Sequence, residues 1–585
     1  MTVFTVPQTK APQTLGLATA RRRIVSDCLV AAGILAVFGV LAYLAPNIAE
    51  PVGPQGIPSA VSTDLHELPY DALRSVLRMA VALGFSFVFS VLYGLAAARS
   101  RRAGKVLIPL LDVLQSVPIL GFLSATVTMW LALFPGSMLG VEAASVFAIF
   151  TSQAWNMAFA FHRSLLSEPA ELDEAARMFR LTRWQRFWKL DMPNAAIPML
   201  YNCMMSVSGG WFFLTASELI SVNNRTYALP GIGSFVAQAA DQGDFGKVGW
   251  GIVTMVVVVL AIDVLVWRPL TAWSQKFRIT QSESDMHPTS LVLTIIRQSH
   301  IDEWLGRLLR PVGDTLELMT RPLGRTGSFR AAKPGRQRAG DIAFNIIVAV
   351  ALFAGTVELF LAIKGSIGFT ETGRIVALGG LTFLRVALLT VACSIIWVPI
   401  GAMIGMNPRL SRIMQPVVQV FSSFPANFLF PFVTIWFLAW NIDINWGSIL
   451  LMALGTQWYI LFNVIAGASQ IPGDLVEMAT NMGLTRTMRW KRLILPSVLG
   501  SWCTGGITAA GGAWNASIIA EFVRSGDHTL VATGLGSYIT EATAAGDAMK
   551  TLVGIVVMSL FVVAVNRLFW EPVERYAAKR FTLVA

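Results

Sequence analysis

Charged residues and cysteines are both scarce in this sequence, and each shortage excludes a class of protein. Charged side chains occupy 14% of the 585 positions and hydrophobic ones 55%, whereas soluble domains average about 25% charged residues. This balance excludes an ordinary soluble enzyme and predicts a chain whose main solvent is membrane lipid. The four cysteines fall in or beside apolar segments without C-x-x-C or Cys/His spacing, which argues against a disulfide framework or a zinc site.

Nucleotide-binding and catalytic motifs are missing as well. The sequence has no G-x-x-x-x-G-K-[ST] phosphate loop, since Gly104-Lys105 and Gly246-Lys247 lack both the upstream glycine and the following hydroxyl. Its five histidines are scattered and form no Ser/His/Asp or Cys/His constellation. We therefore expect this chain to have no catalytic site, no metal site and no cofactor of its own.

Long apolar segments make up most of the remaining sequence. A helix of about 20 apolar residues crosses the hydrocarbon core of a membrane, and the sequence predicts about twelve such spans. They lie near 24–45, 73–98, 106–134, 139–162, 195–220, 248–267, 342–363, 380–405, 412–440, 446–466, 497–520 and 550–569. The predicted fold class is therefore an all-α membrane protein.

Basic residues are concentrated in alternate loops between these spans, although the net charge of +11 could also suggest a polyanionic partner. The loop at 46–72 instead carries four acids, Glu50, Asp64, Glu67 and Asp71. This positive-inside pattern predicts that both termini are cytoplasmic. No basic stripe with interleaved stacking aromatics is left outside the loops, so we expect no nucleic-acid partner.

The chain is an internal duplication. Residues 169–278 align with 472–581 at a constant shift of 303 residues, and a shift of 307 continues the match upstream. Matched pairs include Arg78/Arg385, Pro118/Pro425, Trp211/Trp514 and Glu218/Glu521. The predicted domains are two parallel six-span repeats and a cytoplasmic linker with an interfacial helix around 291–310. They cover 1–268 for the first repeat, 269–340 for the linker and 341–585 for the second repeat.

One charged and aromatic cytoplasmic loop occurs in each repeat, at 168–193 and 471–496. Ser167 as an N-cap and the acids that follow it predict the start of a helix. Gly483 predicts a left-handed turn after that helix, and the prolines that close both ranges predict the end of a second short helix. A merely solvated amphipathic loop has no reason to keep apolar residues in register, so a docking surface is favoured.

The pattern E-A-A, followed after a short gap by L-T-R and later by proline, resembles the EAA loop of permease subunits of type I ATP-binding-cassette importers. In that family the loop forms a coupling helix that rests in a cleft of an ATPase subunit. The resemblance covers both repeats and implies the type I permease fold. It also implies ATPase contacts at Glu174, Ala175, Ala176 and Arg180 in the first loop and at Glu477, Ala479 and Gly483 in the second.

This sequence departs from the family pattern at two positions. Arg180 stands where the family usually has a helix-breaking glycine, and Met478 replaces the first alanine of the second motif. The two docking sites are therefore expected to be unequal. Further along each repeat, the blocks W-x6-E and G-x-G-S resemble the nitrate, alkylsulfonate and bicarbonate branch of these importers.

The resemblance implies a function and a set of partners. The chain would be the permease of an ATP-driven importer in the bacterial inner membrane, forming the path for a small solute such as an oxyanion or small organic anion. Two ATPase subunits would bind ATP and Mg, and a periplasmic or lipid-anchored binding protein would deliver the solute. The alternative is a gradient-driven secondary transporter of the major facilitator type, whose loop signature needs an acid that the stretch at 94–105 lacks.

Two pairs of intramembrane residues are candidates for the translocation path or its gate. Glu218 and Glu521 lie near the outer ends of the fifth and eleventh spans, where an acid costs about 2.5–3.5 kcal/mol unless it faces protein or water. Each could instead cap the backbone N–H groups of the G-x-G turn after it. Trp211 and Trp514 share roughly one helical face with the glutamates and either line the path or pack the helices together. Asp263 is expected to form a structural salt bridge.

Overall fold

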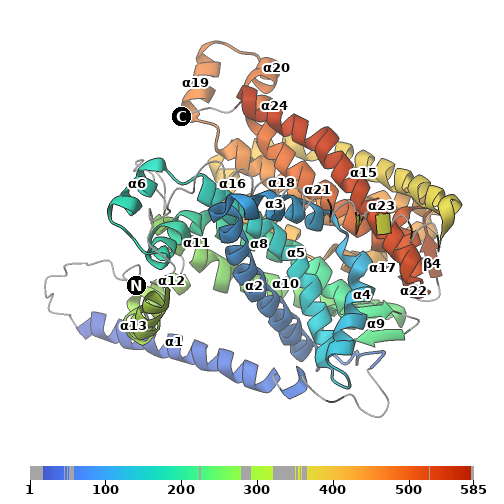
Figure 1. The fold of residues 1–585 in the computed structure, drawn as a ribbon, viewed down its shortest axis with the longest axis horizontal. Coiled ribbons are helices and arrows are strands. Elements are labelled where there is room, and N and C mark those ends of the chain that lie inside the picture. The colour runs from blue at the N-terminus through green and yellow to red at the C-terminus, as the bar shows by residue number, and fades with distance from the viewer. Residues whose placement is uncertain are drawn as a thin grey trace.

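The protein is a bundle of long helices in two repeats of the same element order (Figure 1). The computed structural model describes residues 17–277, 291–320 and 367–581, apart from short gaps at 45, 49–50, 52–57, 223–224 and 526–527, with isolated positions between 350 and 365. The predicted all-α, two-repeat fold is confirmed, and two small β-hairpins are added to it.

The first repeat runs from the N-terminal helix to the helix before the linker. Its helices are α1 (Leu17–Leu44), α2 (Leu68–Arg99), α3 (Arg101–Ser116), α4 (Ile119–Leu133), α5 (Leu139–Leu166), α6 (Ala170–Met178), α7 (Arg183–Arg186), α8 (Met192–Ser217), α9 (Ile232–Asp241), α10 (Phe245–Ile262) and α11 (Arg268–Ser274). Two 3-10 turns, η1 (Pro46–Ile48) and η4 (Gln275–Phe277), two π-turns, η2 (Phe187–Asp191) and η3 (Asp263–Trp267), and one hairpin, β1 (Leu219–Val222) with β2 (Arg225–Ala228), complete it. The linker contributes α12 (Leu291–Gln298) and α13 (Ile301–Thr320).

The second repeat follows the same order from its first described long helix onward. Its helices are α15 (Gly368–Gly405), α16 (Pro408–Ser423), α17 (Phe430–Ala439), α18 (Ile444–Ser469), α19 (Gly473–Asn481), α20 (Arg486–Arg489), α21 (Leu495–Ala520), α22 (Leu535–Ala544), α23 (Ala548–Val565) and α24 (Glu571–Phe581). A 3-10 turn, η6 (Ala426–Leu429), two π-turns, η7 (Trp490–Ile494) and η8 (Asn566–Trp570), and the hairpin β3 (Phe522–Ser525) with β4 (His528–Val531) complete it.

Within the described residues, seven helices are long and apolar enough to cross a membrane, and two bent helix pairs raise that number to nine. The predicted span at 342–363 lies largely outside the described residues. A multi-span membrane protein is thus confirmed, whereas the total of twelve spans stays a prediction.

The spans predicted at 106–134 and 412–440 are not straight, which corrects the sequence interpretation. The first is broken between α3 and α4 by 90°, and the second between α16 and α17 by 76°. The residue before a proline is pushed out of helical geometry, and Val117, before Pro118, is indeed extended at ψ 126°. Because a hydropathy window measures apolar length and not direction, it joined the two arms of each bend.

Each bent segment packs against the opposite repeat. In the first repeat α4 contacts α21, α22 and α23, and in the second α16 and η6 contact α8, with α16 also touching α10. The two repeats therefore exchange equivalent contacts around a shared interface. The short helices α6 and α19 project from the left and the top of the body in Figure 1, and both hairpins lie on the opposite side.

Candidate functional site

Two loops of the same shape project from the helical body. Each begins at a proline that precedes a nine-residue helix, Pro169 before α6 and Pro472 before α19. The acids Glu171 and Asp173 in the first turn of α6 suit the positive end of the helix dipole. Ser167 is not the N-cap predicted from the sequence: it is the C-cap of α5, and Pro169 occupies the N-cap position of α6.

The turn after each nine-residue helix contains a left-handed residue, as Gly483 led us to predict. Gly483 has φ +65° and Arg180 has φ +47°. In the first loop Leu181 N–H donates to the carbonyl of Ala176 at 3.1 Å, and the second loop repeats this bond at the same length. A side chain at such a backbone position costs about 1 kcal/mol, so the first loop carries a strain that the second avoids.

The ATPase-contact residues inferred from the family resemblance differ in exposure. Glu174 and Glu477 are exposed, and Ala175 is half-buried. Ala176 and Ala479 are each only 3% exposed. Both alanines are therefore buried against their own loops in this chain, and their role as ATPase contacts stays a prediction.

Each loop continues without a break into the long helix after it. The prolines at 193 and 496 do not end a short helix, contrary to the sequence prediction, because α7 and α20 run through the π-turns into α8 and α21. In η2 the N–H of Met192 bonds to the carbonyl of Phe187, five residues back, and this wide turn accommodates the proline ring beside it. A displacement of either loop would therefore act directly on a membrane helix.

A network of ion pairs anchors the first loop to its own repeat. Arg186 in α7 pairs with Asp173 at 2.5 Å and with Glu168 at 3.1 Å. Arg99, at the end of α2, pairs with Glu168 at 3.5 Å and with Asp191 in η2. The side chains of Arg186 and Glu168 are only 9% and 5% exposed, so water screens their attraction weakly. The network holds α2, α6 and the start of α8 together.

Two carboxyl groups in this network respond differently to pH. Burial raises the pKa of Glu168, and the charges of Arg186 and Arg99 offset only part of that effect. Burial also acts to raise the pKa of Asp173, but the hydrogen bonds and charges of Arg186 and Arg177 outweigh it and lower the pKa. As pH falls, Glu168 therefore gains its proton before Asp173 does, and the contacts of Glu168 weaken first.

The second loop keeps one member of this network. Four matched positions carry apolar residues, namely Met406 for Arg99, Ile471 for Glu168, Val476 for Asp173 and Ile494 for Asp191. Arg489, which matches Arg186, donates to Thr480 at 3.2 Å, and its buried Nε has no partner among the described residues. The second loop is therefore held by apolar packing where the first is held by charges.

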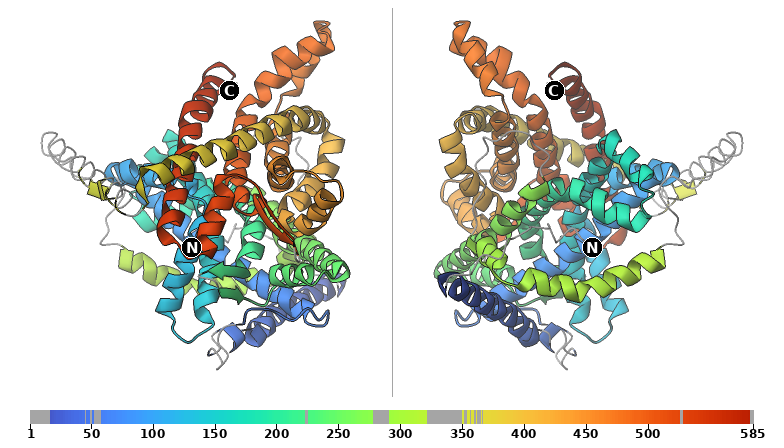
Figure 2. Two further views of the ribbon diagram at one scale, coloured as in Figure 1. Left: turned by 90° about the vertical axis from the view of Figure 1, so that its right-hand side faces the viewer. Right: turned by 90° about the vertical axis from the view of Figure 1, so that its left-hand side faces the viewer.

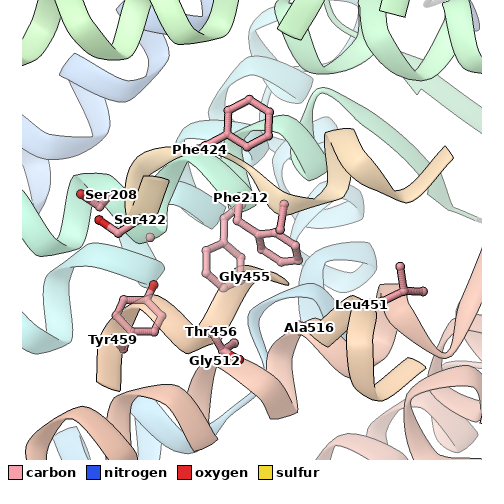
Figure 3. Close-up of a pocket in the computed structure, with 13 residues that line it drawn as sticks. Ser208, Phe212, Ser422, Phe424, Leu451, Gly455, Thr456, Tyr459, Gly512 and Ala516 are labelled. Carbon is pink, nitrogen blue, oxygen red and sulfur yellow. The ribbon is translucent and has the colours of Figure 1, made fainter. Parts of the chain in front are cut away.

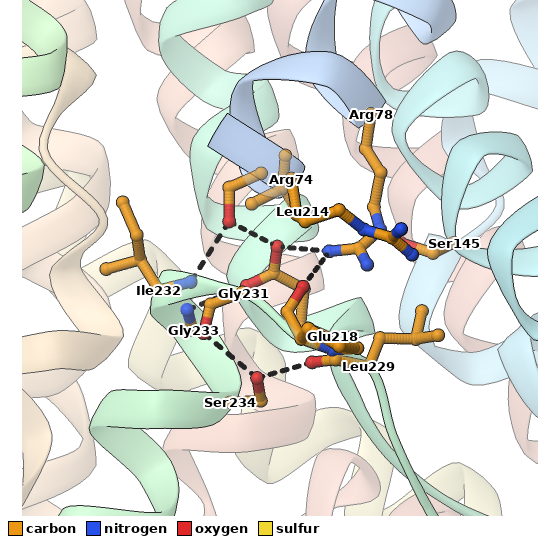
Figure 4. Close-up of polar contacts among 12 residues, drawn as sticks. Arg74, Arg78, Ser145, Leu214, Glu218, Leu229, Gly231, Ile232, Gly233 and Ser234 are labelled. Atoms are coloured by element: carbon orange, nitrogen blue, oxygen red, sulfur yellow. Dashed lines mark hydrogen bonds and ion pairs between the residues drawn. The ribbon is translucent and has the colours of Figure 1, made fainter. Parts of the chain in front are cut away.

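A buried carboxylate stands at the other end of α8, at Glu218, whose side chain is completely buried (Figure 4). It accepts the backbone N–H of Gly233 at 2.7 Å, the hydroxyl of Ser75 at 2.5 Å and an Arg78 N–H at 2.8 Å. The hydrogen bond to the G-x-G turn that the capping interpretation requires is thus present. The arginine from α2 is a partner that the sequence analysis did not assign.

Arg78 binds a second carboxylate in addition to Glu218. Its Nε and Nη2 donate to the two oxygens of Glu142 in α5 at 2.6 and 2.7 Å, and Nη1 also donates to the carbonyl of Pro230 at 2.8 Å. Arg74 pairs with the same Glu142. Two arginines and two glutamates therefore compensate one another where an unpaired charge would be costly.

The second repeat builds the same arrangement around Glu521 with fewer charges. This carboxylate accepts from Gly536 N–H and from the Thr382 hydroxyl, both at 2.8 Å, and from Arg385 at 2.7 Å. Asn445 takes the place of the second carboxylate and accepts from Arg385 at 2.8 Å. Arg385 therefore has a single carboxylate partner among the described residues.

A sequence signal for these pairs existed. Arg78 and Glu218 are intramembrane residues of opposite charge, and both recur in the second repeat as Arg385 and Glu521. The arginines recur at a shift of 307 residues and the glutamates at 303, so an alignment at one shift does not show both pairs together. The buried glutamates also explain the first glycine of each G-x-G turn. A Cβ at Gly231 or Gly534 would overlap the carboxylate of the glutamate in the same repeat. Only glycine allows this close approach.

Trp211 and Trp514 are buried, at 1% and 2% exposure. Trp514 packs on the ring of Phe561, with 5.9 Å between centroids. Their positions fit the helix-packing interpretation better than exposure to a path. Asp263 forms the expected salt bridge, with Arg268 at 2.8 Å.

A small cavity lies where α8 meets the second repeat (Figure 3). Its volume of about 40 Å³ is bounded by the hydroxyl-bearing residues Ser208, Ser422, Thr456 and Tyr459, and no charged residue is among those lining it. A cavity of this size holds at most a few water molecules. The two repeats therefore lie close together around this cavity.

Direct hydrogen bonds also join the two repeats beside this cavity. The Ser208 hydroxyl lies 2.8 Å from that of Ser423 and accepts from Gln419 at 2.9 Å. Asn427 donates to the hydroxyl of Thr215 at 2.9 Å. These contacts join α8 to the bent segment of the second repeat, so a separation of the repeats must break them.

Replacing Glu218 or Glu521 by glutamine should destabilise the protein by different amounts. Glu521→Gln leaves Arg385 without a carboxylate, a change that costs about 3–5 kcal/mol when the cation stays buried. Glu218→Gln should cost less, because Arg78 keeps Glu142. We expect the lower thermal unfolding temperature, measured in detergent by intrinsic fluorescence, for Glu521→Gln. Glu174→Gln, on an exposed site, serves as the control, and equal losses at both buried sites would contradict the charge argument.

The left-handed turns predict opposite effects of exchanging their residues. Arg180→Gly should relieve strain and slow hydrogen exchange of the first loop, while Gly483→Arg should speed exchange of the second, each by about fivefold for about 1 kcal/mol. Hydrogen–deuterium exchange read by mass spectrometry resolves the two loops. Unchanged exchange in both variants would show that the turn conformation carries no strain.

Residues 90–277 and 397–569 each match the family model described as binding-protein-dependent transport system inner membrane component. The nitrate import permease protein NrtB of Synechococcus elongatus is 30% identical over 203 residues, which are 33% of this chain and 68% of that protein. The taurine transport system permease protein TauC of Escherichia coli is 24% identical over 225 residues, 38% of this chain and 76% of its own.

A third relative belongs to the same group. The bicarbonate transport system permease protein CmpB of Synechococcus elongatus is 28% identical over 149 residues, 26% of this chain and 50% of that protein. Each of these relatives matches at most 38% of the present chain, whereas the family model matches it twice. With its duplicated helical fold, the chain therefore belongs to the binding-protein-dependent transport system inner membrane components, as a fused double permease of the ATP-binding-cassette importers.

Proposed function

We propose that this chain forms the membrane path of an ATP-driven importer and that its two projecting loops dock two separate ATPase subunits. The observation that carries the proposal is the shared geometry of the loops: a nine-residue helix, a left-handed turn and a second helix that runs unbroken into a membrane helix. Such a lever converts a push on the loop into movement of α8 or α21. ATP and Mg bind to the ATPases in this scheme.

The solute class follows from the relatives, whose names specify nitrate, taurine and bicarbonate import or transport. We assign a small oxyanion or small organic anion to this chain, delivered by a periplasmic or lipid-anchored binding protein. The path runs between the repeats, past the cavity beside Ser208 and Tyr459. Trp211, Trp514, Glu218 and Glu521 belong to the frame that holds the path-flanking helices, and a gating role for the glutamates requires their ion pairs to open.

The proposal also fixes the orientation of the chain in the bacterial inner membrane. Both loops and both termini face the cytoplasm, and the two hairpins, with the G-x-G turns beside them, face the outside. The charge asymmetry between the loops supports this orientation.

Reconstitution tests the proposed function. The purified chain alone should not hydrolyse ATP, whereas with two bound ATPase subunits its hydrolysis should rise when a loaded binding protein is added. Solute uptake into liposomes by the chain alone, driven by a proton or sodium gradient, would instead support the secondary transporter. Glu174→Arg and Glu477→Arg, on the exposed loop surface, should each reduce the stimulated hydrolysis without changing the unfolding temperature.

Cysteine labelling tests the orientation. In a background with the exposed Cys28 replaced by serine, cysteines at Ser59 and Thr529, both exposed near the hairpins, should react with an impermeant thiol reagent added outside cells. Cysteines at Met178 and Met482, which are 83% and 67% exposed on the loops, should react only after the membrane is opened. The reverse labelling would overturn the orientation.

A further inference from the structure

The linker helices are attached to the first loop. The imidazole and the backbone N–H of His300, just before α13, lie 3.0 and 2.8 Å from the carboxylate oxygens of Asp27 in α1. Near the other end of α13, Glu317 accepts a hydrogen bond from Gln185 of α7 at 2.7 Å. Figure 1 shows α12 and α13 on the same side of the body as α6. The linker is therefore fixed at two points and ends beside a coupling loop.

Gln185 is itself a rigid anchor. Its side chain accepts the backbone N–H of Thr182 at 3.1 Å, and its own N–H donates to the Thr182 hydroxyl at 3.1 Å. This reciprocal capping box fixes the start of α7. The second loop has Met488 at the matching position, 43% exposed, so an equivalent contact is not built there.

Large apolar side chains stand exposed on both sides of this contact. Leu318 and Met319, which follow Glu317 directly, are 60% and 75% exposed. On the first loop, Met178 and Phe179 are 83% and 79% exposed. Apolar surface gathered at a polar cytoplasmic segment is typical of a protein interface or of a membrane-lying helix.

The charges of α13 favour a protein over the membrane surface. The helix carries four acids, Asp302, Glu303, Asp314 and Glu317, against two bases, Arg307 and Arg310. Helices that lie on anionic lipid headgroups are basic, because each added base contributes about 1 kcal/mol of attraction and acids are repelled. On the first loop the exposed apolar pair is flanked by Arg177 and Arg180, which are both exposed, so acids mark the α13 side of this surface and bases the loop side. A protein partner with an apolar patch and charges of both signs around it fits this arrangement.

We propose that α13 and the first coupling loop form one continuous docking surface for the ATPase subunit of the first repeat. The inference rests on the proposed function and adds to it that the two ATPase positions differ in contact area. The first ATPase touches both the loop and the linker, whereas the second touches its loop without such a linker helix. The linker thereby makes the first position the tighter one.

Site-specific crosslinking in the assembled complex tests this surface directly. The complex is purified from its native membranes through a tag on this chain, and a photoreactive benzoylphenylalanine is placed at Met319. A matched control carries it at Leu291 in α12, which is 85% exposed. Crosslinks to the ATPase from Met319 and none from Leu291 are expected. Crosslinks from Met319 to lipid alone would overturn the inference in favour of a membrane-lying linker.

A matched pair of substitutions measures the contribution to affinity. Gln185→Met installs the residue of the second loop and removes the bond to Glu317, while Met488→Gln makes the opposite change in the second loop. The first variant should weaken the binding of one ATPase by about five- to tenfold, as expected for a lost hydrogen bond of about 1 kcal/mol and the loosened helix. The second variant should leave both affinities unchanged.

Native mass spectrometry on dilution of the complex gives the ATPase count for each variant. The inference is supported if the complex of the Gln185→Met variant loses one ATPase at concentrations where the parent complex still holds two. Equal retention by parent and variant, together with no Met319 crosslink, overturns it and leaves the proposed function standing. A parent chain that retains no ATPase would instead overturn the proposed function.

Discussion

A charge buried in a membrane protein has to be compensated, and both repeats are arranged around one buried Arg–Glu pair. Arg78 reaches Glu218 and Arg385 reaches Glu521, with the glutamates completely buried. The arginine comes from α2 or α15, and the glutamate lies at the end of α8 or α21, the helix that continues from a projecting loop. Each pair therefore ties the helix after a projecting loop to another long helix of its repeat, and the G-x-G turn gives the carboxylate the room it needs.

Much of this framework was accessible from the sequence, because duplication makes significant positions visible twice. The repeat identified both glutamates, both arginines, both loops and the left-handed turn at Gly483, and the structure adds that Arg180 adopts the same turn. The Arg–Glu pairing was not accessible in the same way, since the partners are about 140 residues apart in each repeat. Neither hydrophobic periodicity nor motif spacing indicates which buried cation meets which buried anion.

The main errors in the sequence prediction concern chain direction at prolines, because neither apolar length nor the proline itself determines whether a helix bends there. Two predicted spans proved to be bent by 90° and 76°, although Pro118 and Pro425 were already known as a matched pair. Conversely, the prolines at 193 and 496 were expected to end a helix and do not. At Pro118 the helix ends before the proline ring, whereas at 193 a π-turn accommodates the ring and the helix continues. The residues around each proline do not show in advance which of the two will happen.

The two repeats differ most at the loops, and apart from the strained turn at Arg180 these differences make the first loop the more firmly held. Four charged residues that brace it to its repeat are apolar in the second, and the Glu317–Gln185 bond attaches it to the linker. Hydrogen-bonded charges in a partly buried network are held by directional and weakly screened attraction, whereas the apolar side chains of Ile471 and Val476 make only non-directional contacts. The strain at Arg180 can persist because this network over-determines the loop around it. If the loops dock ATPases as we propose, the first would transmit force as a rigid arm, and the second, with its glycine turn, would adjust its position as its partner moves.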